Sequence, residues 1–133
     1  MRLQPFVKVD DTPFDANRAQ IERTWGAPRA ATTNGIGLIE LDYGRAVFRF
    51  QASTGRLEEI TKRAAILYLV DGRDVVDVPF AALEPFVHAY DPAAFERATF
   101  LICPRYGFAF VPAEPDWVTA LAVHCIDTWR CLG

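Results

Sequence analysis

The sequence predicts an α+β domain in which helices pack on an antiparallel sheet. Short runs rich in valine, isoleucine and phenylalanine, separated by turn residues such as Asp71-Gly72, indicate antiparallel strands. Other segments carry apolar residues at helical spacing and have capping residues at their ends. We therefore expect about six to eight strands and three helical segments, near residues 13–25, 79–96 and 116–130, in a single domain spanning residues 1–133.

The first helix has the clearest boundaries, and residues 6–9 precede it as a short edge strand. Thr12 can cap this helix, with Pro13 at the first helical position. Gly26 can adopt the left-handed conformation that ends a helix, and Pro28 prevents the helix from resuming. The apolar residues between these ends recur at helical spacing: Phe14, Ile21 and Trp25.

Two similar hairpins are expected, one over residues 38–50 and one over residues 98–111. Each contains an apolar run, a Tyr-Gly pair at the turn and further aromatic residues. In the first hairpin, Phe48 and Phe50 share one face of a strand while Arg49 takes the other, which is typical of a half-buried strand. An internal duplication of a helix–hairpin unit explains this repeat, and so do two independent hairpins with a common turn.

Between the hairpins the sequence predicts three more strands and the second helix. Residues 56–63 form a charged strand, residues 64–70 an apolar strand covered on both faces, and residues 75–78 a returning strand. Residues 79–96 follow as a helix that Pro85 splits or kinks, because a proline inside a helix removes a backbone hydrogen bond.

A final helix is expected from Trp117 to about Arg130. Asp116 can cap it, after a stiff connector at residues 112–115. Its buried stripe comprises Val118, Leu121, Ala122, Cys125 and Trp129.

The composition predicts a folded cytosolic protein. Hydrophobic residues make up 51% of the chain, which argues for a packed core and against disorder. The N-terminus lacks the apolar segment of a signal peptide, and the longest apolar run, residues 64–70, is too short to span a bilayer. We expect the three cysteines to be reduced. The net charge of −3 gives no overall bias toward nucleic acid, so neither a nucleic acid nor a membrane is an expected partner.

One third of the chain carries a family resemblance, in the segments Phe14-Asp15, Ile21, Trp25-Gly26-x-Pro28, Leu41-x-Tyr43-Gly44, Phe48-Arg49-Phe50 and Gly55-Arg56-Leu57-Glu58-Glu59-Ile60. Residues 14–60 resemble the helix-then-hairpin unit of BLIP-like and SmpA/OmlA-like small bacterial proteins. The resemblance implies a protein-binding role, as an enzyme inhibitor or as part of an envelope assembly machine. Those proteins are usually exported, whereas this sequence shows neither signal peptide nor lipidation cysteine, which argues against envelope assembly. The small, acidic α+β build also resembles that of cytosolic toxin-immunity proteins.

The residues that could act in catalysis or bind a metal are not arranged as such a site requires, so the sequence predicts no catalytic site, no metal site and no cofactor. Cys125 follows His124, but neighbours on a helix point about 100° apart, and Cys125 lies on the apolar stripe. Glu58 and Glu59 are adjacent on a strand, so we expect them to point to opposite faces rather than to form a catalytic pair. The spacing of the other candidate ligands matches no zinc motif: His88, Cys103 and Cys131.

The charge distribution favours a protein partner, and a basic one in particular. Residues 71–96 carry six acidic residues against one arginine, whereas residues 45–70 carry five basic residues against two acidic ones. An acidic patch can steer a basic partner, and tryptophan and tyrosine are enriched at binding hot spots. The predicted contact residues are Asp71, Asp74, Asp77, Glu84, Tyr90 and Trp117.

We therefore expect a small, non-enzymatic protein that binds another protein, as an inhibitor or an immunity-type module. One alternative is an enzyme that uses Cys125 or Cys103 with a histidine. A second alternative is a homo-oligomeric structural protein that associates through exposed aromatic residues.

Overall fold

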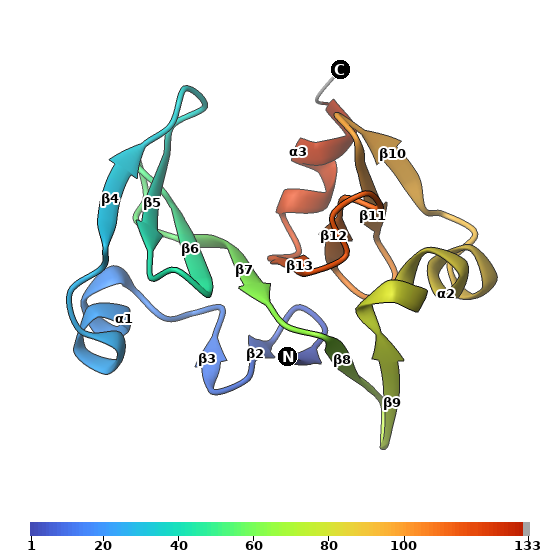
Figure 1. Ribbon diagram of the computed structural model, residues 1–133. Coiled ribbons are helices and arrows are strands. Elements are labelled where there is room, and N and C mark those ends of the chain that lie inside the picture. Colours follow the sequence, from blue (N-terminus) through green and yellow to red (C-terminus); the bar gives the residue numbers. More distant parts are fainter. Residues whose placement is uncertain (132–133) are drawn as a thin grey trace.

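The computed structural model describes residues 1–131, which form two sheets and three α-helices (Figure 1). The smaller sheet has the order β3-β2-β1-β8-β9 and contains β1 (Arg2–Gln4), β2 (Lys8–Val9), β3 (Thr12–Pro13), β8 (Ile66–Asp71) and β9 (Asp74–Pro79). The larger sheet has the order β10-β11-β12-β13-β7-β6-β5-β4 and contains β4 (Ala30–Thr33), β5 (Leu38–Asp42), β6 (Ala46–Gln51), β7 (Leu57–Arg63), β10 (Phe95–Arg97), β11 (Phe100–Cys103), β12 (Phe108–Phe110) and β13 (Trp117–Leu121).

The helices are α1 (Arg18–Trp25), α2 (Leu83–Tyr90) and α3 (Cys125–Cys131), and a 3-10 turn, η1 (Phe80–Ala82), precedes α2. The β1–β8 pair is parallel, and the other strand pairs are antiparallel. The predicted α+β class is therefore confirmed, although residues 1–131 contain two sheets, of eight and five strands, rather than one sheet of six to eight. Within these residues, no helix has the length and apolar character needed to cross a bilayer.

The eight-stranded sheet consists of two consecutive halves. The strands β4–β7 follow α1, and the strands β10–β13 follow α2. The last strands of the two halves, β7 and β13, pair at the centre of the sheet, where Thr61 lies opposite Thr119. Figure 1 shows β4, β5 and β6 on one side of the molecule and β10, β11 and β12 with α3 on the other. Outward from this central pair, the strands of each half therefore follow one another in reverse chain order: β7, β6, β5 and β4 on one side, and β13, β12, β11 and β10 on the other.

The two Tyr-Gly pairs lie in hairpin turns, but the turns differ. Gly44 (φ 88°) follows Tyr43 in a tight turn that is closed by a hydrogen bond from the Tyr43 amide to the Ala46 carbonyl. Gly107 (φ 68°) ends a longer turn, and its amide donates to the Cys103 carbonyl. Both glycines have a backbone conformation that other residues rarely adopt. The shared dipeptide thus occupies different positions in two different turns.

The two tyrosines tie these turns to neighbouring elements. Tyr43 Oη donates to the carbonyl of Gly26, which follows α1, at 2.9 Å. Tyr106 Oη donates to the carboxylate of Asp71 at the end of β8, at 3.1 Å. The first contact holds α1 against the β5–β6 turn, and the second holds the smaller sheet against the β11–β12 turn.

The main core lies between one face of the larger sheet, the smaller sheet, α1 and α2. Phe48, Phe50 and Phe108 are fully buried in it, as expected for the two phenylalanines of β6. The other face of the β10–β13 half packs against α3, through residues that alternate along the strands with those of the main core: Ile102, Ala109 and Leu121. The helix α3 therefore covers one half of that face.

The first helix begins later than expected. Asn17 caps it and accepts from the Gln20 amide, while the Gln20 side chain accepts from the Asn17 amide, so the two residues form a capping box. Thr12, the expected cap, belongs to β3 and pairs with Val9. Gly26 follows the helix, as predicted, but with φ 80° and ψ −160° it adopts an extended positive-φ conformation rather than the left-handed one.

The second helix is shorter than the predicted segment 79–96. Pro85 lies in the first turn of α2, where a backbone N–H has no acceptor within the helix, so the proline neither splits nor kinks it. Residues 95–97 form β10 and pair with β11. The neighbouring strand β8 also differs from expectation, because one of its faces is open: Leu67 and Leu69 are buried while Tyr68 is 39% exposed.

The prediction of a continuous helix over residues 116–130 is wrong. Residues Trp117–Leu121 form β13, which pairs with β7 on one side and with β12 on the other. Residues 118–121 are buried on both faces of the sheet, so their apolar run lacks the alternation that identifies a half-buried strand. The helix α3 begins only at Cys125.

Candidate functional site

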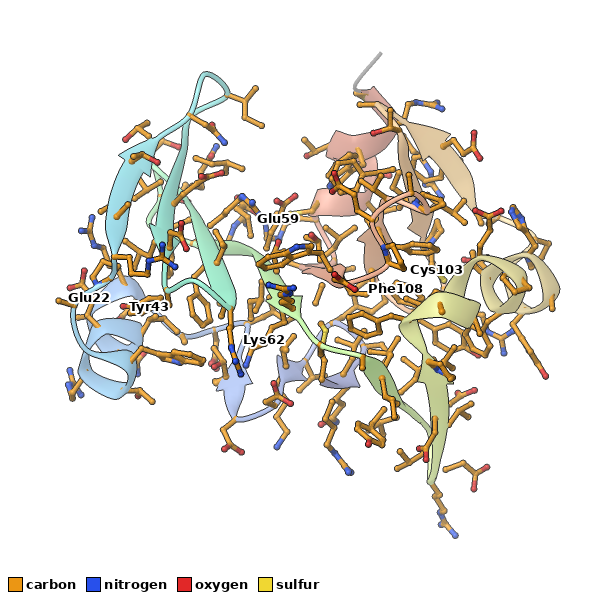
Figure 2. All side chains as sticks on the ribbon, viewed as in Figure 1. Glu22, Tyr43, Glu59, Lys62, Cys103 and Phe108 are labelled. Atoms are coloured by element: carbon orange, nitrogen blue, oxygen red, sulfur yellow. The ribbon has the colours of Figure 1, made fainter. Side chains whose placement is uncertain are left out.

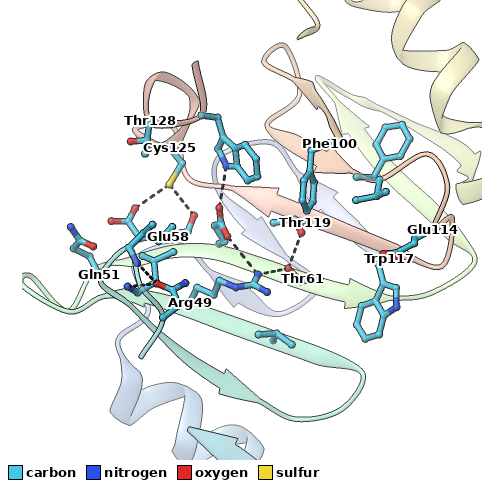
Figure 3. Close-up of a pocket in the computed structure, with 18 residues that line it drawn as sticks. Arg49, Gln51, Glu58, Thr61, Phe100, Glu114, Trp117, Thr119, Cys125 and Thr128 are labelled. Carbon is cyan, nitrogen blue, oxygen red and sulfur yellow. Dashed lines mark hydrogen bonds and ion pairs between the residues drawn. The ribbon is translucent and has the colours of Figure 1, made fainter. Parts of the chain in front are cut away.

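A cleft of about 590 Å³ opens on the face of the larger sheet that α3 covers only in part (Figure 3). Strands from both halves of the sheet contribute to it, together with α3 and the segment between β12 and β13. Much of the lining is apolar or aromatic: Leu38, Val47, Phe100, Phe110, Trp117 and Trp129. This size and lining are typical of ligand sites, which are mostly apolar with a few convergent polar groups.

The floor of the cleft carries a chain of polar side chains that crosses four strands. Arg49 Nε donates to Glu40 Oε1 at 2.8 Å, and Arg49 Nη1 lies 3.5 Å from Glu59 Oε1. Arg49 Nη1 also donates to Thr61 Oγ1 at 2.7 Å, and the hydroxyls of Thr61 and Thr119 lie 2.8 Å apart. Glu40, Arg49 and Glu59 are direct cross-strand neighbours, so the sheet register itself brings these charges together.

Glu59 is the most buried charged group of this chain of contacts. Burial raises the pKa of the Glu59 carboxyl, although the Arg49 guanidinium and a hydrogen bond from Trp129 Nε1, at 3.1 Å, act in the opposite direction. Figure 2 shows Glu59 in the middle of the molecule, between the side chains of the two halves of the sheet.

Glu58 and Glu59 both line the cleft, so the prediction that they point to opposite faces is wrong. Arg49 pairs with Glu59 and Phe50 pairs with Leu57, which leaves Glu58 as an extra residue in β7. Such a β-bulge interrupts the strict alternation of side chains. The bulge therefore adds a second carboxylate to the cleft face of β7.

Glu58 contacts both His124 and Cys125, which lie at the start of α3. Cys125 Sγ lies 3.0 Å from Glu58 Oε2 and 3.3 Å from the Glu58 carbonyl oxygen, so its one S–H can donate to either, and His124 Nε2 contacts the same carboxylate oxygen. Figure 3 shows Cys125 directed toward Glu58. The sequence analysis missed this cluster because Glu58 lies 66 residues before His124, and no motif spans that separation.

The surroundings of both buried thiols disfavour the thiolate that a cysteine nucleophile needs. Burial, together with the nearby Glu58 carboxylate, raises the pKa of the Cys125 thiol. Burial also raises the pKa of Cys103 to about 12, and the Cys103 thiol donates to Asp91 Oδ2 at 3.2 Å. The expectation that Cys125 is a core residue is confirmed.

The predicted acidic contact residues are exposed, but they do not form one patch. Asp71 and Asp74 pair across the β8–β9 turn. Asp77 pairs with Tyr68. This pair lies three residues along each strand from the Asp71–Asp74 pair, so Asp77 points to the opposite face of the hairpin. We use the name hairpin surface for both faces of this hairpin together, that is, for Asp71, Asp74 and Asp77 with the exposed Val75 and Val76.

The remaining predicted contact residues lie in two places. Tyr90 of α2 is 54% exposed and packs on Phe86, which stacks on Tyr106, the partner of Asp71 in the hairpin surface. Glu84 is exposed on the same helix. Trp117 lies apart from them, because it lines the cleft.

Comparisons of the chain with protein-family models, with curated proteins and with solved structures found no match.

Proposed function

We propose that the protein is a non-enzymatic, cytosolic protein-binding module, an inhibitor or an immunity-type protein, and that the cleft receives a basic side chain of its partner. The observation that supports this most directly is the combination of aromatic walls and acidic groups in one cleft. Aromatic rings and carboxylates together favour a lysine or arginine, through cation–π contacts and ion pairing.

The charge of the cleft supports a basic occupant. Glu58, Glu59 and Glu114 line it against the single guanidinium of Arg49, which is already engaged with Glu40 and Glu59. The Glu114 side chain lies at an exposed position on the segment between β12 and β13. A cationic group entering the cleft therefore meets more carboxylates than basic groups.

The state of the thiols supports binding over the enzyme alternative. Burial raises the pKa values of Cys103 and Cys125, and both thiols donate to carboxylates. Among residues 1–131, Cys103, Cys125 and Cys131 are free cysteines, which fits a reducing compartment.

We also propose that the two halves of the larger sheet arose by duplication of one helix–hairpin unit. Each half is a helix followed by four antiparallel strands, and the fourth strands pair with each other. The resemblance of residues 14–60 to BLIP-like and SmpA/OmlA-like proteins, and the looser resemblance to immunity proteins, stay predictions.

The test begins with affinity capture from cells of the native host, using the full chain as bait. The captured protein is then purified, and its dissociation constant is measured against a set of variants. Trp117→Ala should weaken binding about 30-fold, because a hot-spot tryptophan contributes about 2 kcal/mol or more. Glu114→Lys should weaken binding and reduce its salt dependence.

The control for Glu114→Lys is Asp116→Lys, at an exposed position two residues further along the same segment that does not line the cleft. Binding of the control should stay close to that of the unmodified protein. A triple charge reversal at Asp71, Asp74 and Asp77 tests the hairpin surface instead. If only the triple reversal weakens binding, the hairpin surface is the contact and the cleft assignment is wrong. If a partner binds all variants equally, both surfaces are excluded.

A further inference from the structure

The cluster of Glu58, His124 and Cys125 contains three chemically different metal-ligand atoms, a carboxylate oxygen, an imidazole nitrogen and a thiol sulfur. These atoms all lie within 4.8 Å of one another. In a tetrahedral zinc site, bond lengths of about 2.0–2.3 Å place ligand atoms roughly 3.3–3.8 Å apart. The side chains are therefore close to the required separation, and adjustments of about an ångström allow all three to reach one ion.

The backbone already holds the ligands in register. The Ala122 amide donates to the Glu58 carbonyl at 3.0 Å, and the Cys125 amide donates to the Ala122 carbonyl at 2.9 Å. These bonds fix the segment before α3 on β7 at the bulge that carries Glu58. A site supported in this way loses little conformational freedom when an ion binds.

We propose that Glu58, His124 and Cys125 bind a zinc ion with a fourth coordination position open toward the cleft. Cys125 and Glu58 are buried, with 6% exposure each, and both line the cleft, whereas His124 is partly exposed to solvent. Three protein ligands with one open position are characteristic of zinc sites that exchange a water or another ligand.

The donor set selects among metals. Calcium and magnesium prefer oxygen ligands, and a thiolate together with an imidazole suits zinc. With the cysteine and the glutamate deprotonated, their two negative charges balance the ion. Glu59 and Glu114 then still outnumber Arg49 in the cleft, so a bound zinc ion is compatible with a basic occupant.

The test uses the full chain, reduced and freed of metal with a chelator, and titrated with zinc chloride against a chromophoric zinc chelator. We expect one zinc ion per chain with a dissociation constant below about 1 μM. Cobalt chloride should give the visible absorption of a tetrahedral site together with a near-ultraviolet thiolate-to-cobalt band. This measurement requires no partner, so its result is independent of the proposed binding function.

Cys125→Ser and His124→Ala should each weaken zinc binding at least about tenfold, and Cys125→Ser should remove the thiolate-to-cobalt band. The matched controls are Cys131→Ser and His88→Ala, at exposed positions outside the cluster, and these should bind zinc like the unmodified chain. Circular dichroism verifies that each variant is folded. The proposal is overturned if the unmodified chain binds no stoichiometric zinc, or if binding persists in both cluster variants or is lost in a control.

Discussion

Replacing Arg49 by methionine should destabilise the protein by removing the cation between two carboxylates. Arg49 lies 2.8 Å from Glu40 and 3.5 Å from Glu59, and its side chain is 22% exposed. Methionine keeps much of the apolar stem but leaves Glu59, whose side chain is 11% exposed, without a cationic neighbour in this chain of contacts.

The size of the expected stability loss follows from the intermediate burial of the Arg49 side chain. Breaking a fully buried ion pair from one side costs about 3–5 kcal/mol, whereas an exposed pair contributes roughly 0–1 kcal/mol. We therefore expect Arg49→Met to lower the free energy of unfolding by about 2–3 kcal/mol. Adding Glu59→Gln removes the unpaired carboxylate, so the double variant Arg49→Met/Glu59→Gln should recover about 1 kcal/mol or more of that loss.

The assay is urea unfolding at pH 7, followed by circular dichroism and tryptophan fluorescence. Arg45→Met is the matched control, because Arg45 is an exposed arginine in the β5–β6 turn, and it should change stability by less than about 0.5 kcal/mol. The account of the cleft floor is wrong if Arg49→Met behaves like the control. It is also wrong if the double variant is less stable than Arg49→Met alone.

Three further predictions concern other contacts. Burial alone would raise the pKa of Asp10, but hydrogen bonds from Lys62 and a backbone amide outweigh it and lower the pKa. The ionised Asp10 therefore stabilises the fold at neutral pH, and this contribution is lost as the pH falls through the folded-state pKa. Asp10→Asn should accordingly flatten the acid limb of a stability–pH profile. Asp91→Ala should cost about 2–4 kcal/mol in urea unfolding, because this buried carboxylate accepts from two backbone amides and a thiol, and a cost below about 1 kcal/mol contradicts that role. Gly107→Ala should cost about 1–3 kcal/mol, because a Cβ at φ 68° would lie 2.6 Å from the Phe6 ring, and an unchanged melting temperature argues against that contact.

Local sequence signals predicted the parts of the fold that local contacts determine. The alternation of Phe48 and Phe50 with Arg49 identified the buried face of β6, and the Asp71-Gly72 pair identified the β8–β9 turn. Gly26 marked the end of α1 correctly. In each case the determining residues lie within a few positions of one another, so the pattern in the sequence is complete.

Long-range pairing decided the parts that the sequence did not predict. β13 is buried on both faces because the main core covers one face and α3 packs on the other, and a segment with two buried faces shows the same apolar run as a buried helix. The orientation of Glu58 depends on a bulge opposite Phe50, which alternation along one strand does not reveal. The cleft and the cluster of Glu58, His124 and Cys125 depend both on the central position of β13 and on this bulge in β7.

The most direct test of the central claim is site-specific photo-crosslinking at the cleft. A benzophenone amino acid replaces Ile36, a 66% exposed residue that lines the cleft, and in a second variant it replaces Val75 of the hairpin surface, which is 44% exposed. After irradiation in cells of the native host, the account predicts a covalent adduct of one defined mass at position 36, and its loss when Glu114→Lys is added. An adduct at position 75 without one at position 36, or an adduct at position 36 that Glu114→Lys leaves unchanged, would contradict it.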